Sequence, residues 1–168
     1  MKFSIFALFI FFSTISCSMA QTEFSNETRS SQLLDITNQK VTFKEILQKH
    51  KGKTIVFEFW ASWCSDCVKS MPRLKELQAK NPNVEYVFIS LDKKPEKWVE
   101  GIDKHQLKGD HYLVTDPDGM KGEFGKSINL DWIPRYIIVD KSQKILLYKA
   151  IEKDFEQMQS VLDKAAAQ

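Results

Sequence analysis

The segment from Ile55 to Cys67 reads IVFEFWASWCSDC, and it constrains the fold more than any other part of the chain. The run from Ile55 to Trp60 is short, apolar and rich in aromatic and β-branched residues, which predicts a buried strand. From Ser65 onward, apolar residues recur at helical spacing. The strand is therefore expected to lead directly into a helix, with Cys64 and Cys67 at the junction.

The rest of the chain predicts an alternation of strands and helices. We expect a hairpin at 33–43, strands at 84–91, 135–140 and 144–149, and helices at 43–52, 65–80, 95–107, 120–128 and 155–167. Two strands that flank a helix form a parallel unit, and the late hairpin adds an antiparallel edge. The predicted fold class is a three-layer α/β/α sandwich with a mixed central sheet and an N-terminal hairpin extension. Pro72 is expected to kink its helix without ending it.

The first twenty residues differ from the rest. Lys2 precedes an apolar run of about ten residues and then a small-residue exit, which is the pattern of a secretory signal peptide at 1–20. We favour cleavage after Ala20. Lipid attachment at Cys17 and an uncleaved apolar anchor remain open alternatives. All three place the domain outside the cytoplasm, in the periplasm or an equivalent compartment.

The remaining chain has the length of a single domain. Residues 21–31 are polar and aperiodic, so we expect a flexible linker there, followed by one domain at 32–168. The net charge of +2 argues against a polyanionic partner, and nucleic-acid binding has little support.

The cysteine count points to chemistry. If Cys17 leaves with the signal, only Cys64 and Cys67 remain, and their loop is too short to stabilise a fold by closure entropy. A sulfur at the amino end of a helix meets unpaired N–H groups that favour an anion, so Cys64 should ionise readily and attack. Cys67, one turn later, should be less exposed and should resolve the mixed disulfide. No metal is expected, because the histidines are scattered.

Glu58 is an acid inside the apolar strand. Its neighbours imply that the strand is covered on both faces, where a charged carboxylate is costly. Desolvation should raise its pKa toward the range of a proton carrier. Exposure at a strand edge, or pairing with a lysine, is the alternative.

The stretches FWASWCSDC and WIPRYIIVD resemble those of the thioredoxin-like superfamily, and more narrowly its extracytoplasmic branch of TlpA- and ResA-like thiol–disulfide oxidoreductases. The resemblance covers residues 32–168. It implies that Glu58 accepts the proton of Cys67, and that Trp63 shields the disulfide. It also implies that Pro134 is a cis-proline and that the Ile133 backbone pairs with the substrate.

The same resemblance implies a redox-active disulfide with no other cofactor, protein clients, and a membrane-bound thiol donor that reduces the spent disulfide. We expect a monomer that acts as a reductant, in part because Asp66 places a negative charge beside the thiolate. Delivery of electrons to apocytochrome c is one narrower role. A disulfide-forming oxidant, a thiol peroxidase and a binding module without redox activity remain as alternatives.

Overall fold

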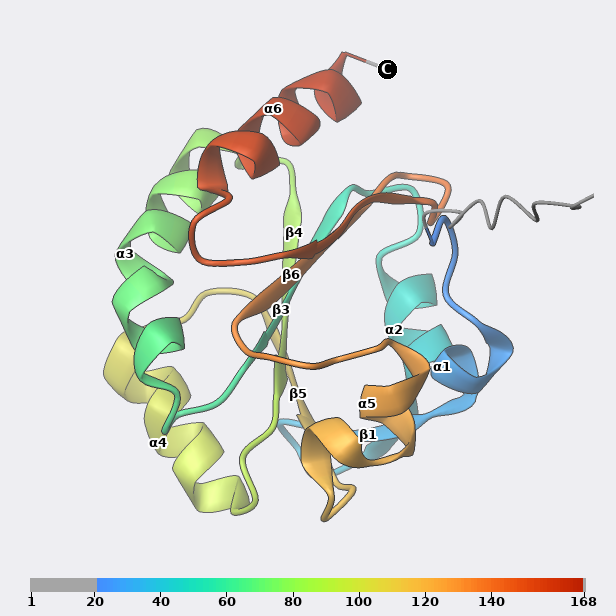
Figure 1. Ribbon diagram of the computed structural model, residues 1–168, viewed down its shortest axis with the longest axis vertical. Coiled ribbons are helices and arrows are strands. Elements are labelled where there is room, and N and C mark those ends of the chain that lie inside the picture. The colour runs from blue at the N-terminus through green and yellow to red at the C-terminus, as the bar shows by residue number, and fades with distance from the viewer. Residues whose placement is uncertain (1–20, 168) are drawn as a thin grey trace, which may run out of the picture.

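The computed structural model describes residues 21–167, which form one mixed sheet between two helical layers (Figure 1). The strands are β1 (Gln32–Asp35), β2 (Lys40–Thr42), β3 (Ile55–Trp60), β4 (Glu85–Ser90), β5 (Asp110–Val114), β6 (Arg135–Val139) and β7 (Ile145–Ala150). The helices are α1 (Asn26–Ser30), α2 (Phe43–Lys49), α3 (Ser65–Lys80), α4 (Pro95–His105), α5 (Glu123–Ser127) and α6 (Phe155–Ala166), with a 3-10 turn at Gly119–Lys121. The three-layer α/β/α architecture is confirmed.

The strand order is β2-β1-β5-β4-β3-β6-β7, which puts β3 well inside the sheet. β3 pairs in parallel with β4 and antiparallel with β6, so the predicted parallel unit, mixed sheet and late hairpin are all present. The early hairpin of β1 and β2 also forms, and it joins the sheet through antiparallel pairing of β1 with β5. α3 runs unbroken through Pro72.

Alternation along β3 decides which layer each side chain faces. Phe57 packs against Phe43 of α2, in the layer that also holds α1 and α5 (Figure 1). Trp60 lies against Gly101 of α4, on the opposite layer with α3. Glu58 stands two residues before Trp60 on the strand, so its side chain faces the same side of the sheet, toward α3.

The linker predicted at 21–31 is wrong for its second half. Asn26–Ser30 forms α1, and Thr28 donates a hydrogen bond to the Ser127 carbonyl at the end of α5. Phe24 is buried edge-on against Phe43. The burial of Phe24 and the Ser25 side chain, which caps α1, hold a segment of polar composition in place. The predicted signal at 1–20, with Cys17, lies outside the described residues.

The strand β5 was missed. It is short, and the polar Lys108-Gly109-Asp110 stretch that leads into it gives no alternating pattern, with Asp110 as its first residue. Gly109 has φ of +148°, and a Cβ there would lie 2.3 Å from the carbonyl oxygen of Tyr86. The strand exists because it fills the gap between β1 and β4, which is a tertiary effect.

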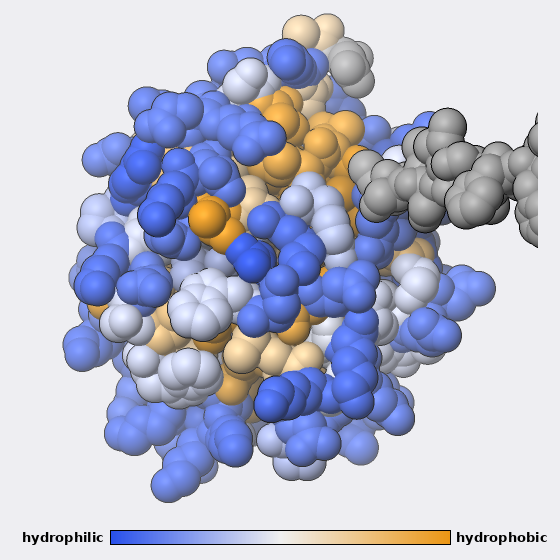
Figure 2. Space-filling view, in the orientation of Figure 1, coloured by the Kyte–Doolittle hydropathy of each residue, from blue (hydrophilic) through white to orange (hydrophobic). Residues whose placement is uncertain are grey.

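The surface seen in Figure 2 is largely hydrophilic, with apolar area gathered mainly beside α6. Among residues 21–167, no helix combines the length and the apolar character needed to span a bilayer. The exposed large hydrophobic side chains are Ile36, Trp63, Val99, Trp132 and Leu146. One of them, Trp63, is a predicted site residue, and Trp132 directly precedes another, Ile133.

Candidate active site

Cys64 and Cys67 form a disulfide at the start of α3. Cys64 is the N-cap residue, and its sulfur accepts the backbone N–H of Cys67 at 3.1 Å. Cys64 is 6% exposed and Cys67 is 0% exposed. The strand-to-helix junction thus places the first sulfur at the helix amino end and the second beneath it, as the sequence predicted.

The loop before β6 faces this disulfide. The Ile133–Pro134 peptide bond is cis, and the carbonyl oxygen of Ile133 lies 3.6 Å from the Cys64 sulfur. Trp63 is 62% exposed and Trp132 is 55% exposed. Trp63 is therefore a surface ring next to Cys64 and no part of the core, while Ile133 and Pro134 are buried. Trp132, directly before Ile133, is likewise a surface ring.

Charged side chains tie this loop to the neighbouring strand. Asp131 accepts hydrogen bonds from Arg135 at 2.9 Å and from Lys149 of β7 at 2.9 Å. Lys149 first, and Arg135 second, hold the pKa of Asp131 at about 2. Exposed pairs add little to stability. They connect the loop that leads into the cis-proline to β6 and β7.

Glu58 lies on β3, on the sheet face toward α3, and is 2% exposed. Its Oε1 accepts a hydrogen bond from the Tyr136 hydroxyl at 3.2 Å, and the two residues are register partners on β3 and β6. Burial raises the pKa of Glu58 to about 8, although the Tyr136 hydroxyl lowers it in part. Neither an exposed edge position nor a lysine partner is found for Glu58 within residues 21–167.

Ser70 connects this acid to α3. Its hydroxyl donates to the Cys67 carbonyl at 2.8 Å and lies 3.1 Å from the Tyr136 hydroxyl. The sequence singled out neither Tyr136 nor Ser70. A signal was available in the strand pattern. Tyr136 stands two residues after Pro134 on a strand predicted to be buried, and alternate residues of an extended segment face the same side.

Asp92 is a buried carboxylate that sequence reasoning also missed. It accepts the backbone N–H of Ser62 at 2.9 Å, the Ser62 hydroxyl at 2.7 Å and the Ser90 hydroxyl at 2.8 Å. Ser62 directly precedes Trp63 and Cys64. Asp92 therefore holds the turn that leads to Cys64, and an acid directly after a buried strand was the clue.

Replacing Asp92 with alanine should destabilise the fold by about 3 kcal/mol, because a buried N–H and two hydroxyls lose a charged acceptor. Urea unfolding measures this loss. Asp140→Ala is a matched control, since Asp140 also accepts three hydrogen bonds, from Ser142 and Lys144, but at the surface. Its loss should stay below about 1 kcal/mol. Equal losses in the two variants would show that Asp92 does not hold the turn.

A family model described as thioredoxin-like matches residues 52–145. The chain belongs to the thioredoxin-like family. The thiol–disulfide oxidoreductase ResA of Bacillus thuringiensis subsp. konkukian is 26% identical over 144 residues, which cover 84% of this chain and 78% of that protein. With this relative and its own Cys64–Cys67 pair, this thioredoxin-like protein is a thiol–disulfide oxidoreductase.

Solved structures agree with the fold. The thioredoxin domain of a thiol–disulfide oxidoreductase from Bacteroides vulgatus superposes with a TM-score of 0.68 at 23% identity, covering 88% of this chain and 98% of that one. A thioredoxin-like protein from Porphyromonas gingivalis gives a TM-score of 0.69 at 19% identity, covering 87% and 94% of the two chains. At these identities the likeness concerns the fold alone.

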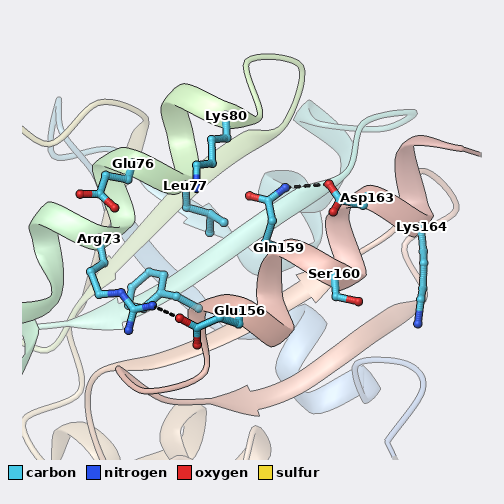
Figure 3. Close-up of a pocket in the computed structure, with 10 residues that line it drawn as sticks. Arg73, Glu76, Leu77, Lys80, Glu156, Gln159, Ser160, Asp163 and Lys164 are labelled. Atoms are coloured by element: carbon cyan, nitrogen blue, oxygen red, sulfur yellow. Dashed lines mark hydrogen bonds and ion pairs between the residues drawn. The ribbon is translucent and has the colours of Figure 1, made fainter.

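A separate hollow of about 440 Å³ lies between α3 and α6 of this thioredoxin-like domain (Figure 3). Arg73 reaches across it to pair with Glu156, and the guanidinium stacks over the Phe155 ring at 4.9 Å. None of the predicted site residues lines it. Within residues 21–167, no group of three or more His, Cys, Asp or Glu side chains is arranged to hold a metal ion.

Proposed function

We propose that the protein works outside the cytoplasm as a reductant of protein disulfides. The Cys64 thiolate attacks a client disulfide and forms a mixed disulfide, while one client sulfur leaves as a thiol. Cys67 then attacks the Cys64 sulfur and releases the second client sulfur. Two electrons pass from the Cys64–Cys67 dithiol to the client, and the protein is left with the disulfide.

The burial of the two sulfurs supports this division of roles. Cys64 keeps some solvent access at the helix start, whereas Cys67 has none. Only an accessible sulfur meets a client, and only a sulfur within bonding reach of Cys64 resolves the intermediate. The disulfide at the amino end of α3 is the observation that carries the proposal.

Glu58 is proposed to take the proton from Cys67 as Cys67 attacks. A buried acid with a pKa near 8 changes its protonation state close to physiological pH. A carrier is most effective when its pKa lies near the operating pH. In the re-reduction half of the cycle, the protonated acid returns this proton to Cys67.

The client is proposed to lie along the loop before β6. The Ile133 carbonyl, 3.6 Å from the Cys64 sulfur, is placed to accept a backbone N–H from an extended client segment. Trp63 and Trp132 would offer their exposed rings to apolar side chains that flank the client cysteine. Rigid exposed aromatic rings are common anchors of protein recognition.

The reducing direction is supported by an acid near the sulfurs. Asp66 lies in the first turn of α3. Its negative charge disfavours the thiolate, so the dithiol is less stabilised and its disulfide is less oxidising. Lys69, 3.5 Å from Asp66, offsets part of this effect.

The partner is proposed to be a membrane-bound thiol donor that returns electrons to the spent disulfide. The signal-like segment 1–20 supports a location outside the cytoplasm. Cysteines that must stay reduced there, such as the haem-attachment pair of apocytochrome c, form a client class that fits this activity.

The reduction potential of the Cys64–Cys67 couple tests the direction. We expect a value near about −270 mV, the range of reducing thioredoxins, whereas about −120 mV would mean an oxidant and overturn the proposal. Asp66→Asn should raise the potential by about 20 mV, which corresponds to about 1 kcal/mol. Asp103→Asn, at an exposed position on α4, is the control and should leave the potential unchanged.

A further inference from the structure

A continuous chain of buried hydrogen bonds joins Glu58 to the helix that carries Cys67. Glu58 Oε1 lies 3.2 Å from the Tyr136 hydroxyl, and that hydroxyl lies 3.1 Å from the Ser70 hydroxyl. Ser70 in turn lies 2.8 Å from the Cys67 carbonyl oxygen. All four residues are buried. The thiol–disulfide exchange described above uses Glu58 and Cys67 and leaves the two hydroxyls unexplained.

We propose that Tyr136, held by Ser70, is a positioning residue that supports Glu58 in both of its protonation states. The Tyr136 hydroxyl donates to Glu58 when the carboxylate is charged and accepts from Glu58 when it is protonated. The inference rests on the proposed role of Glu58 as the proton carrier.

The hydroxyl hydrogens of Tyr136 and Ser70 allow the direction of hydrogen-bond donation to reverse when Glu58 changes its protonation state. A hydroxyl has one donor and two lone pairs. With Glu58 charged, Ser70 donates to Tyr136 and Tyr136 donates to Oε1. With Glu58 protonated, the acid donates to Tyr136, Tyr136 donates to Ser70, and Ser70 donates to the Cys67 carbonyl. With Glu58 protonated, all three links have a donor; with Glu58 charged, the Ser70 hydrogen moves from the Cys67 carbonyl to Tyr136, and both hydroxyls still donate one hydrogen bond in either state.

The Glu58 carboxyl depends on the Tyr136 hydroxyl for its side-chain hydrogen bonding. Glu58 Oε2 has no hydrogen-bond partner within residues 21–167, and Tyr136 is the donor found for Oε1. The titratable group that faces the pair, on the Tyr136 side, is Glu152 in the turn before α6, while Ser70 links Tyr136 to the backbone carbonyl of Cys67. No cation from β4, β6 or the helices compensates the carboxylate in this part of the chain.

The titration of the Glu58 carboxyl carbon by ¹³C NMR, in the oxidised full chain, tests the proposal directly. Tyr136→Phe should raise the midpoint by about one pH unit, because the bond that Tyr136 donates to the charged carboxylate is stronger than the bond it accepts from the protonated acid, and a tenfold difference between them is one unit. Ser70→Ala should shift it upward by less, since Tyr136 keeps its bond to Glu58 but loses its own second partner. The pH at which mixed-disulfide release reaches half its plateau should move with the midpoint.

Tyr86→Phe is the matched control. Tyr86 is also a buried tyrosine, on β4 next to β3, and its hydroxyl has no partner within residues 21–167. This variant removes the same atom and should leave the Glu58 midpoint where it is in the parent. A shift as large as that of Tyr136→Phe would show a general packing effect and would overturn the proposal.

The remaining outcomes separate this inference from the proposed function. An unchanged midpoint in Tyr136→Phe overturns the inference, and the proton-carrier role still stands if Glu58→Gln slows release. Parent release rates in Glu58→Gln overturn the carrier role whatever the NMR titration gives. If Tyr136→Phe does not fold, Ser70→Ala decides, and an unshifted midpoint there counts against the inference.

Discussion

Cys67→Ser is expected to hold the protein on its client as a stable mixed disulfide. Cys64 can still attack, but the sulfur that would displace the client is gone. Cys67 is bonded to Cys64 in the oxidised protein and is shielded from solvent, so its attack is intramolecular and no external thiol easily replaces it. Well-oriented intramolecular groups act at very high effective concentration, so release should slow by about a thousandfold or more.

The trapped complex is measured on non-reducing gels after mixing with a disulfide-bonded client protein, and its decay gives the release rate. Cys64→Ser is the control, because it removes the accessible sulfur and should form no complex. A complex of equal yield with Cys64→Ser would mean that the two cysteines have exchanged roles. Release from Cys67→Ser at the parent rate would contradict the resolving step altogether.

The β3–α3 unit was predictable because its signals are local. An apolar run, a change to helical spacing and a pair of cysteines at the junction lie within one short stretch. The parallel β4 and the late hairpin followed from the same kind of pattern. β5 and α1 were not predictable in this way, since β5 depends on neighbours on both sides and α1 on the burial of Phe24.

The site residues divide in the same way, into those marked by local sequence and those set by tertiary contacts. Cys64, Cys67 and Glu58 stand in one segment, and the resemblance located Trp63, Ile133 and Pro134 by their motifs. Tyr136 and Glu58 are 78 residues apart, and Asp92 and Ser62 are 30 residues apart. These contacts arise from strand register and from packing, which no single segment encodes. The sequence predicted candidate reacting groups, and the structure adds the side chains that contact them and their turns.

Glu58→Gln is expected to slow release of the mixed disulfide by about a hundredfold at neutral pH, the usual contribution of a positioned general base. In the parent, the rate should rise with pH toward the Glu58 pKa of about 8, because only the charged carboxylate accepts the proton. The variant should lack this inflection, and the first attack by Cys64 should be unaffected. Stopped-flow measurement of both steps across pH 6 to 9 separates these effects; a variant that keeps the inflection would assign it to another group.

The same variant should be more stable than the parent at alkaline pH. The folded protein holds the Glu58 proton up to a pKa of about 8, whereas the unfolded chain releases it at the ordinary value of 4.5. Between these values the native state binds more protons, so the parent loses stability as pH rises, by about 1.4 kcal/mol per pH unit.

Glutamine carries no charge, so Glu58→Gln escapes this loss and its advantage should grow across the window to several kcal/mol near pH 8. Urea unfolding of the oxidised proteins at pH 5, 6.5 and 8 measures the difference, with the cysteines bonded and unable to titrate. Glu76→Gln, at an exposed position on α3, should follow the parent at every pH. If the curves of Glu58→Gln and the parent run parallel, the buried acid does not keep its proton, and it is then unable to carry one for Cys67.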